Sequence, residues 1–420
     1  MEIPNKIKKY MELIIDNGYE CFLVGGAVRD YLLNKRNKDY DLCTNISLDK
    51  LKELVPNLAL MKENDHRTTA ITRIDDYDIE FSEYRGKTLK EDLSNRDFTM
   101  NAIAVDVEGN FIDYFNGIDD IEKKTVSLIK KNGEAFDIDA LRVLRTIRQA
   151  LKLNFIIDKN TKAKMLDKKH LLQDVVKERV LDELKKILVS DNVEYYLIEY
   201  KEIFFEIIPE LKRCDGFNQY NDYHIYDVYR HIVHVVKNSP KDIYLRLAAL
   251  FHDIGKPDKF FLDENGKGHF LNHASVSYEI FDRFADKYKA DNRTKRVVEA
   301  LILYHEDLLS NKSNKIYNFY KKYDMDKIEM LFDLKIADIK AQNPKYIDRI
   351  EKIMKQEEKY INVRSRINQI SYNGDDLKTL GYNGKIIGTI LDDVKRQIIN
   401  NVINNDKQSI NNYVQKKYLI

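Results

Sequence analysis

The sequence lacks tryptophan and has only three cysteines and six prolines among its 420 residues. The cysteines, Cys21, Cys43 and Cys214, form no Cys-x-x-Cys pair, so the sequence indicates neither a disulfide framework nor a thiolate zinc site. No window approaches the roughly 18 apolar residues of a membrane helix, so no membrane span is expected. The first residues, MEIPNK, are too polar for a signal peptide. We therefore expect a reduced, cytoplasmic setting.

The sequence also lacks an excess of charge of either sign. Lys and Arg number 70 and Asp and Glu 69, giving a formal net charge of +1. No global field therefore drives nucleic-acid binding, and any basic surface must be local. The hydrophobic content of 43% suffices for ordinary cores. A chain of this length is expected to hold several domains.

A buried strand, a glycine turn and a helix are predicted near the start of the chain. Residues 21–24 are apolar and predict a strand. Gly25 and Gly26 allow a sharp turn and a close approach to a ligand. A helix over 27–33 then opens from the turn, and its unpaired N–H groups suit a triphosphate. Arg29 in its first turn can add a forked donor.

Two carboxylates follow this turn in a Lys-Asp-Tyr-Asp-Leu run. Asp39 and Asp41 stand at i, i+2, so on a strand both point to one face. Their repulsion calls for a cation, and Mg2+ commonly takes one or two carboxylates plus substrate phosphates. Alone, Gly-Gly is often an ordinary turn and Asp-x-Asp a solvated strand end. Together, in this order, they favour a metal–nucleotide site.

The combination of Gly25-Gly-Ala-Val-Arg-Asp30 with Asp39-Tyr-Asp41 resembles the head domain of the bacterial tRNA nucleotidyltransferase and poly(A) polymerase family. That family lies within the DNA polymerase β-like superfamily. Residues 69–74 and 77–81 are predicted strands, and Glu80 is a candidate third carboxylate of the metal site. The alternative for Glu80 is an ordinary surface position on a strand.

A second match to this family starts at Asn95-Arg-Asp-Phe-Thr-Met-Asn101. The family writes the segment Arg-Arg-Asp-Phe-Thr-x-Asn-Ala, so Asn95 replaces the first Arg. Arg96 can hold phosphate or base. Asp97 can accept from ribose hydroxyls, which is how a site prefers ribonucleotides. The alternative is that Asp97 only caps a helix.

A third match lies in a stretch rich in Lys and Arg, residues 130–186, for which two or three helices are predicted. Asp139 and Arg142 stand at i, i+3, a spacing that shares a helix face. In the family a Glu-Asp-x-x-Arg motif reads the base with protein groups. The resemblance therefore implies that Asp139 and Arg142 form this template pair, with Arg145 and Arg148 near phosphate. Ile138 stands where the family usually has Glu, and the alternative is a solvated arginine face.

Seven of the nine histidines lie between residues 224 and 305. His231, the pair His252-Asp253, and Asp338 fall on predicted helices and resemble the HD phosphohydrolase superfamily, in which two His and two Asp hold one divalent metal. Mixed imidazole and carboxylate ligands do not fix which metal binds. Among the other histidines of this stretch, His273 and His305 are candidates for binding a second metal or a phosphate. The alternative is a degenerate, structural HD fold.

These resemblances imply an α+β fold. A small mixed β-sheet nucleotidyltransferase head is followed by an all-helical neck, an HD domain and a helical tail. The expected boundaries are 1–125 for the head, 126–211 for a neck that binds nucleotide bases and RNA, 212–346 for the HD domain and 347–420 for the tail.

The implied activity is template-independent addition of CCA to tRNA 3′ ends from CTP and ATP, with release of pyrophosphate. Mg2+ would be held by Asp39 and Asp41, with Glu80 as the further candidate, and an unspecified divalent metal would occupy the HD site. Open alternatives are a poly(A) polymerase, a partial CC- or A-adding enzyme, or an HD phosphohydrolase as the main activity. A pure RNA-binding role is least favoured. Expected partners are tRNA and the two nucleotides, and the sequence sets no oligomeric state.

Overall fold

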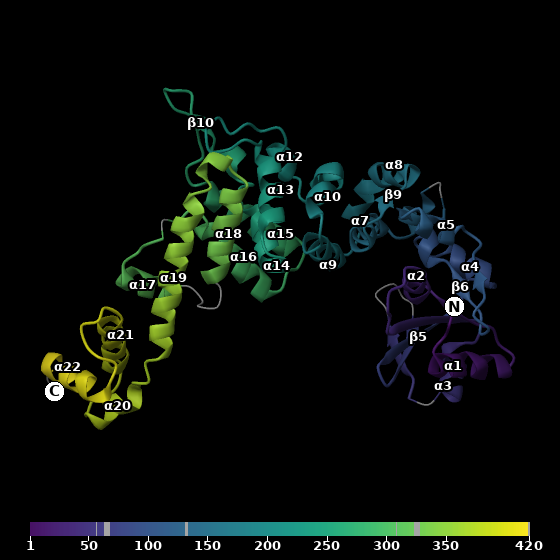
Figure 1. Ribbon diagram of the computed structural model, residues 1–420, viewed down its shortest axis with the longest axis horizontal. Coiled ribbons are helices and arrows are strands. Elements are labelled where there is room, and N and C mark those ends of the chain that lie inside the picture. Colours follow the sequence, from purple (N-terminus) through teal and green to yellow (C-terminus); the bar gives the residue numbers. More distant parts are fainter. Residues whose placement is uncertain (56, 63–67, 131–132, 308, 323–327, 419–420) are drawn as a thin grey trace. The chain divides into compact units, whose positions relative to one another are not determined.

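The computed structural model describes residues 1–420 except 56, 63–67, 131–132, 308, 323–327 and 419–420 (Figure 1). The chain divides into two compact units. The first holds Met1–Asn192 and Tyr200–Ile207, and the second holds Val193–Glu199 and Ile208–Ile420. A seven-stranded mixed sheet lies in the first unit, whereas the described part of the second unit is helical apart from one short hairpin. The predicted α+β class is confirmed.

The large sheet has the strand order β3-β4-β5-β2-β1-β6-β7. Its strands are β1 (Cys21–Val24), β2 (Asp39–Thr44), β3 (Ala59–Lys62), β4 (Thr68–Ile74), β5 (Tyr77–Glu83), β6 (Ala104–Val105) and β7 (Phe111–Ile112). Strand β2 pairs antiparallel with β1 and parallel with β5. The centre of the sheet therefore joins the strand before the glycine turn to the two strands that carry the predicted carboxylates.

The helices of the head pack against this sheet. They are α1 (Asn5–Asp16), α2 (Gly26–Leu32), α3 (Leu48–Leu54), α4 (Leu89–Ser94) and α5 (Gly117–Glu122), with a short 3-10 turn η1 (Thr99–Asn101). Helix α1 buries Ile7, Met11 and Ile14, the spacing of one helix face. A core cluster joins β1, β2, α4 and β6 through Val24, Cys43, Leu89, Leu93, Ala102 and Ala104. This cluster holds the segment around Arg96 beside the glycine turn.

More helices follow in the first unit than the two or three predicted for residues 130–186. The elements are α6 (Glu134–Ile138), α7 (Arg142–Leu153), α8 (Lys159–Lys168), η2 (Lys169–Gln173), α9 (Lys177–Leu188) and α11 (Lys201–Ile207). Two short parallel strands, β8 (Thr125–Val126) and β9 (Ile156–Ile157), tie the end of the head to this helical part. Helix α7 packs against α9, and Arg148 Nε donates to Glu183 Oε2 at 2.5 Å across that contact.

The second unit begins with α10 (Val193–Glu199) and α12 (Leu211–Cys214) and continues as a helical bundle. Its further elements are α13 (Val228–Asn238), α14 (Ile243–Phe251), η3 (Lys256–Lys259), β10 (Phe261–Leu262), β11 (Gly268–His269), α15 (His273–Lys287), α16 (Asn292–Tyr304), α17 (Ser313–Lys322), α18 (Ile328–Lys340) and η5 (Pro344–Tyr346). Asp227 and Asp242 cap α13 and α14 by accepting from backbone N–H groups. Helices α13, α14, α16 and α18 pack together, so residues at their facing ends meet inside the bundle.

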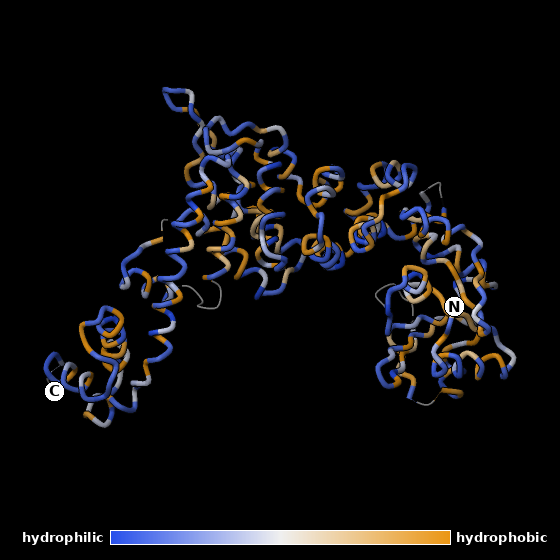
Figure 2. The backbone as a smooth tube through the Cα atoms, in the orientation of Figure 1, coloured by the Kyte–Doolittle hydropathy of each residue, from blue (hydrophilic) through white to orange (hydrophobic). Residues whose placement is uncertain are grey.

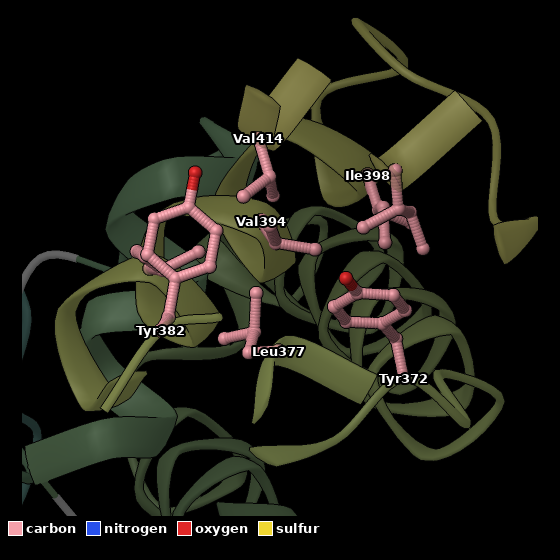
Figure 3. Close-up of a cluster of buried hydrophobic side chains, with 8 residues drawn as sticks. Tyr372, Leu377, Tyr382, Val394, Ile398 and Val414 are labelled. Atoms are coloured by element: carbon pink, nitrogen blue, oxygen red, sulfur yellow. The ribbon is translucent and has the colours of Figure 1, made fainter. Parts of the chain in front are cut away.

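The tail consists of α19 (Arg349–Asn368), α20 (Gly374–Thr379), α21 (Ile386–Ile399) and α22 (Lys407–Lys417). Its last three helices enclose a core of Tyr372, Leu377, Tyr382, Ile390, Val394, Ile398, Ile410 and Val414. Figure 3 shows the labelled members of this cluster pointing toward one another. Asn373 starts α20 with a capping box closed by Asp376.

Hydrophobic and hydrophilic residues alternate along the helices in Figure 2. Among the described residues, no helix combines the length and the apolar character needed to cross a membrane.

Candidate functional site

The three predicted carboxylates of the head share one face of the sheet. In the parallel pair β2–β5, Asp41 stands opposite Glu80 and Asp39 opposite Asp78. Side chains alternate along a strand, so Asp39 and Asp41 point to the same side, and Glu80 joins them through the register. Asp78, which sequence reasoning missed, falls on this face as well, and its carboxylate lies 3.5 Å from Arg73 Nε.

Asp41 is held directly against the glycine turn. Its carboxylate accepts a hydrogen bond from the backbone N–H of Gly26. A Cβ on Gly25 would lie 2.7 Å from Asp41 Oδ2, and Gly25 has a φ of +74°, so both contact and backbone require glycine. Burial raises the pKa of Asp41, Arg96 and Gly26 oppose that rise, and the nearby charge of Asp39 adds to it. The two carboxylates are therefore close enough to repel each other.

These residues fit a hard divalent cation. The donors are carboxylate oxygens, which suit Mg2+. No three described donor residues of the head lie within 4.8 Å of one another, so the strands offer a converging pair with Glu80 beside it rather than a closed cage. Mg2+ is commonly bound in this way, with phosphates and water completing its coordination.

Arg29 joins the glycine turn to the Asp97 segment. Its Nε and Nη2 donate to Asp30 Oδ1 at 2.9 and 2.7 Å, and its Nη1 donates to Asn101 Oδ1 at 2.8 Å. Asn101 in turn donates to Asp97 Oδ1 at 2.9 Å. The buried guanidinium thus fixes the predicted sugar-binding aspartate relative to the turn.

Arg96 is fixed beside Asp41 by a buried acid. Its Nε and Nη2 donate to Asp92 Oδ2 at 3.1 and 3.0 Å, and the Asp92 side chain is fully buried. The backbone N–H of Arg85 donates to the other oxygen of Asp92 at 3.0 Å. Asp92 therefore places the positive charge of Arg96 next to the predicted metal-binding carboxylates, and no sequence motif indicates this role.

The prediction that Asp139 and Arg142 share a helix face is wrong. Helix α6 ends at Ile138, Asp139 is extended with φ −148° and ψ 98°, and α7 begins at Arg142. Asp139 Oδ2 instead lies 3.7 Å from Arg145 and 3.6 Å from Arg179. The helix is interrupted between the two predicted partners, and a spacing argument that assumes a continuous helix fails there.

Arg142 connects the neck to the head segment. Its Nη2 donates to the carbonyl of Asn95 at 2.9 Å and its Nη1 to that of Ala135 at 3.4 Å. Arg148 is engaged by Glu183. The structure thus places Asp139 and Arg145 together and sets Arg142 and Arg148 in separate contacts. Their roles toward a nucleotide remain predictions.

The four predicted HD residues meet at one buried point. Asp253 Oδ2 lies 3.2 Å from the Nε2 atoms of both His231 and His252. His231 Nε2 also lies 3.0 Å from Asp338 Oδ1. These residues come from α13, the end of α14 and α18, so bundle packing brings them together.

A second cluster uses the other oxygen of Asp253. Asp253 Oδ1 lies 2.8 Å from His273 Nε2 and 3.6 Å from His305 Nε2, and the two imidazole nitrogens are 3.3 Å apart. His224, which sequence reasoning did not single out as a ligand, forms a further ligand group with His231 and Asp253. Its place in the histidine-rich stretch was the one sequence signal for it.

The tautomers of three histidines follow from their backbone contacts. The Nδ1 atoms of His252, His273 and His305 each face a carbonyl oxygen. A carbonyl only accepts, so each Nδ1 carries the proton and each Nε2 presents a lone pair. The partners are the carbonyls of Ala249, Phe270 and Ile302, at 2.8, 2.9 and 2.7 Å.

This arrangement fits a divalent metal. Within the described residues, His231 Nε2, His252 Nε2 and Asp253 Oδ2 are buried without a hydrogen bond of ordinary geometry. Burial lowers the pKa of His252, while Asp253 and Asp338 outweigh the effect of burial and raise that of His231. The Nε2 lone pairs of His252 and His273 face Asp253 with no proton between them, and such an arrangement is stabilised by a cation.

A cavity of about 600 Å3 adjoins this centre. Asp338 and His305, which belong to the two clusters around Asp253, both line it. Its wall includes the cations Lys256, Lys335 and Arg349. The lining is completed by Tyr223, His224, Glu306, Asp307, Leu309, Ile339, Gln342, Tyr346, Ile353 and Gln356.

Three protein families match successive parts of the chain. The poly A polymerase head domain matches residues 21–127. The family described as the probable RNA and SrmB-binding site of polymerase A matches residues 154–214. The HD domain matches residues 221–342. The head and the HD domain are both of kinds that typically depend on metals.

The chain is also similar to curated relatives and to solved structures. The chain is 33% identical to the CCA-adding enzyme of Lactococcus lactis subsp. lactis over 205 residues, 44% of this chain and 51% of the relative. It is 32% identical to that of Staphylococcus haemolyticus over 232 residues, 51% of this chain and 57% of the relative. The chain thus spans about half the length of the curated relatives it matches.

The fold is that of solved CCA-adding enzymes over nearly the whole chain. The Bacillus stearothermophilus enzyme in complex with CTP has a TM-score of 0.68 at 20% identity, covering 99% of this chain and 98% of that one. The Thermotoga maritima enzyme complexed with tRNA has a TM-score of 0.62 at 18% identity, covering 98% and 95%. These comparisons bear out the resemblance to bacterial tRNA nucleotidyltransferases that carry an HD domain.

Proposed function

We propose that this chain, which joins a poly A polymerase head domain to the associated RNA-binding segment and an HD domain, adds CCA to tRNA 3′ ends from CTP and ATP. The observation that supports this proposal most directly is the register between β2 and β5. It sets Glu80 beside Asp41 on the face shared with Asp39, against a turn that only glycine fits. The curated relatives that the chain matches over about half their length are named CCA-adding enzymes.

Asp39 and Asp41, with Glu80 beside them, would hold Mg2+ in the head. The ion would supply charge neutralisation for the triphosphate and for the terminal 3′-OH as pyrophosphate leaves. Gly25 and Gly26 bring the backbone close to the nucleotide. Arg29 and Arg96 contribute positive charge from positions fixed by Asp30 and Asp92, and Asp97 accepts from the ribose.

The neck would select the base and hold the RNA. Asp139 and Arg142 remain the proposed template pair. They would contact the base from the two sides of the break between α6 and α7, and not from one helix face. Arg145 and Arg148 add positive charge along α7, which suits contact with the phosphate backbone. The division at 125, 211 and 346 into head, neck, HD domain and tail stays part of this proposal.

End-labelling of tRNA transcripts tests the activity. Transcripts that end before CCA, after C or after CC are incubated with Mg2+ and single labelled nucleotides. CTP is expected to extend the first two by C, and ATP only the third, by one A. Long A tracts from ATP alone would instead identify a poly(A) polymerase, and failure at one step a partial CC- or A-adding enzyme.

The buried HD cluster favours a second activity, metal-dependent phosphoester hydrolysis. The observation that supports it is that buried imidazole nitrogens converge on the carboxylates of Asp253 and Asp338. Water would replace the ester oxygen on phosphorus, releasing the alcohol and phosphate. His231, His252, Asp253 and Asp338 would hold one ion of unassigned identity, whose Lewis acidity would assist the attack. Asp253, His273 and His305 offer a place for a second.

Paired variants separate the two activities. Asp39→Ala is expected to abolish nucleotide addition and to leave hydrolysis of phosphoesters intact. His252→Asn is expected to do the reverse. If Asp39→Ala removed hydrolysis as well, one site would account for both reactions and the HD proposal would fall.

A further inference from the structure

A cavity of about 790 Å3 lies in the head, separate from the metal carboxylates. Tyr40 lines it and stands between Asp39 and Asp41 on β2, so its ring points to the opposite face of the sheet. The rest of the lining comes from the start of α1, from α2, from the loop between α2 and β2, and from the turn between β4 and β5. Its volume is within the range of ordinary small-ligand sites.

Tyrosine rings form part of the wall of this cavity. Tyr40 is buried and Tyr77 half-buried, and their ring centroids are 5.6 Å apart at an interplanar angle of 81°. Tyr31 of α2 also lines the cavity and is 42% exposed. Phe111 supports it from β7, with ring centroids 6.3 Å apart at 36°. A supported and partly exposed ring offers a face on which an aromatic group can stack.

Ion pairs engage two of the three acids in the lining. Lys6 pairs with Asp75, and Lys38 Nζ lies 3.4 Å from Asp76 Oδ2. Both acids belong to the turn between β4 and β5. These pairs close one side of the cavity and leave its charge balance to the other lining residues.

Two further cations line the cavity on the loop between α2 and β2. They are Lys35 and Arg36, and among the residues that the structure describes neither forms an ion pair. Glu2 is the third acid of the lining, so four cations face three acids and the balance is +1. Lys35 follows Tyr31 by four residues, so the surplus charge lies on the segment that carries the exposed ring.

Hydrogen bonds fix this loop to the strand that carries the metal carboxylates. Asn37 Oδ1 accepts from the backbone N–H groups of Lys38 and Asp39 at 2.8 and 3.1 Å. The backbone N–H of Asp78 donates to the carbonyl of Lys38 at 2.9 Å. The cations therefore extend from a fixed backbone on one side of β2, with the proposed metal site on the other.

We infer that this cavity binds a nucleotide unit, with the base against Tyr31 and the phosphate on Lys35 and Arg36. A phosphate accepts the forked donors of arginine, and a base has the flat face that the tyrosine ring needs. A base-free phosphoester leaves the ring uncovered, and an uncharged aromatic molecule leaves the cations unused. The inference goes beyond CCA addition, whose nucleotide would lie on the carboxylate face. A free nucleoside phosphate and a residue of single-stranded RNA share this chemistry, and the test separates them.

A tryptophan reporter tests the inference at the cavity itself. The chain has no tryptophan, so Tyr31→Trp gives the full-length protein a single indole in the lining. Adenosine and cytidine 5′-monophosphates are expected to quench its fluorescence. Ribose 5-phosphate, titrated as a competitor, is expected to bind roughly tenfold more weakly, since stacking on one aromatic residue contributes about that factor. Tyr195→Trp, at a 57% exposed tyrosine of the second unit, should respond to neither mononucleotide.

Loss of the loop charges tests the phosphate contact. In the reporter protein, Lys35→Gln with Arg36→Gln is expected to weaken mononucleotide binding about tenfold, the effect of losing two exposed ion pairs. Lys9→Gln with Lys52→Gln removes the same charge from exposed positions of the head outside the lining and should change nothing. An unquenched reporter, or quenching that ignores the loop charges, would overturn the inference.

Two further titrations locate the nucleotide and identify its source. Asp97→Ala alters the proposed catalytic nucleotide site, so quenching that persists in this variant supports the cavity, and quenching that disappears would overturn it. An unstructured RNA hexamer is compared with the monophosphates on the same reporter. Tighter binding of the hexamer identifies an RNA strand as the source of the nucleotide unit, and equal or weaker binding identifies a free nucleotide.

Discussion

Gly25 links the backbone conformation of the turn to the position of Asp41. Its φ of +74° costs an alanine about 1 kcal/mol, and the new Cβ would meet Asp41 Oδ2 at 2.7 Å. Gly25→Ala must therefore displace the carboxylate. We expect a loss of nucleotide addition of at least about 100-fold, as small misplacements of reacting groups cause. Initial rates on a tRNA lacking its terminal A measure it.

Gly18→Ala is the control for backbone strain. Gly18 has a similar φ of +84°, yet a Cβ there would have no neighbour within 4 Å. Both variants should lose comparable stability in thermal unfolding, and only Gly25→Ala should lose activity. Equal activity loss in the two would show that backbone strain, not the Asp41 contact, explains the effect.

Gln342 is a positioning residue for the HD centre. It holds Asp338 Oδ2 while Asp338 Oδ1 faces His231. Gln342→Leu keeps most of the volume and removes the donor, so we expect metal affinity to fall by about 10- to 100-fold, the usual effect of losing a ligand's hydrogen-bond partner. Competition with a chromophoric chelator measures the affinity. Gln369→Leu, which removes an exposed glutamine just after the end of α19, should leave it unchanged.

Individual residues could be predicted where the chemistry is local. Gly25, Asp39 and Asp41 lie within one strand–turn–strand segment, so their spacing alone indicates a metal–nucleotide site. Asp92 and Gln342 could not be found this way. Each acts through a partner whose approach depends on packing, and neither residue type is unusual where it stands, Asp92 on α4 and Gln342 just after α18.

At the scale of elements, continuity and register decide which residues meet. Asp139 and Arg142 have helical spacing, but the chain leaves the helix at Asp139 and starts again at Arg142. A sequence pattern cannot reveal such a short break because the residues on both sides favour helix. Glu80 shows the opposite case: its place beside Asp41 follows from a parallel pairing of strands distant in sequence.

The contact between α7 and α9 depends on a buried acid. Glu183 accepts from Arg148 at 2.5 Å, lies 3.5 Å from Lys186, and has a side chain only 6% exposed. Glu183→Ala leaves the arginine without this partner, so we expect a loss of about 1–3 kcal/mol in the free energy of unfolding. Denaturant unfolding measures it. Asp182→Ala, an exposed change on the same helix, should cost far less.

The whole molecule carries two carboxylate centres in two compact units. The sequence anticipated both because each is marked by a short run: Gly-Gly with Asp-x-Asp in one, His-Asp in the other. The remaining residues of the two centres are brought into place by different structural features. The head centre is finished by strand register, and the HD centre by helices that bring His231, His273, His305 and Asp338 around Asp253.

Metal removal should therefore act unequally on the two units. The HD ligands are buried, and their imidazole nitrogens face carboxylates. A bound ion offsets the repulsion among these groups in the folded state, so it stabilises the folded second unit. An ion present at 100 times its dissociation constant stabilises the folded state by about 2.7 kcal/mol, or roughly 5–10 °C in a domain of this size. The head carboxylates lie at a strand face and gain less stability from a bound ion.

Calorimetry with and without chelator should show one unfolding transition shifting in temperature and the other nearly unchanged. In His252→Asn, which lacks one ligand, the chelator should move neither. If both transitions moved together in the unaltered chain, the two centres could not be treated as separate sites in separate units.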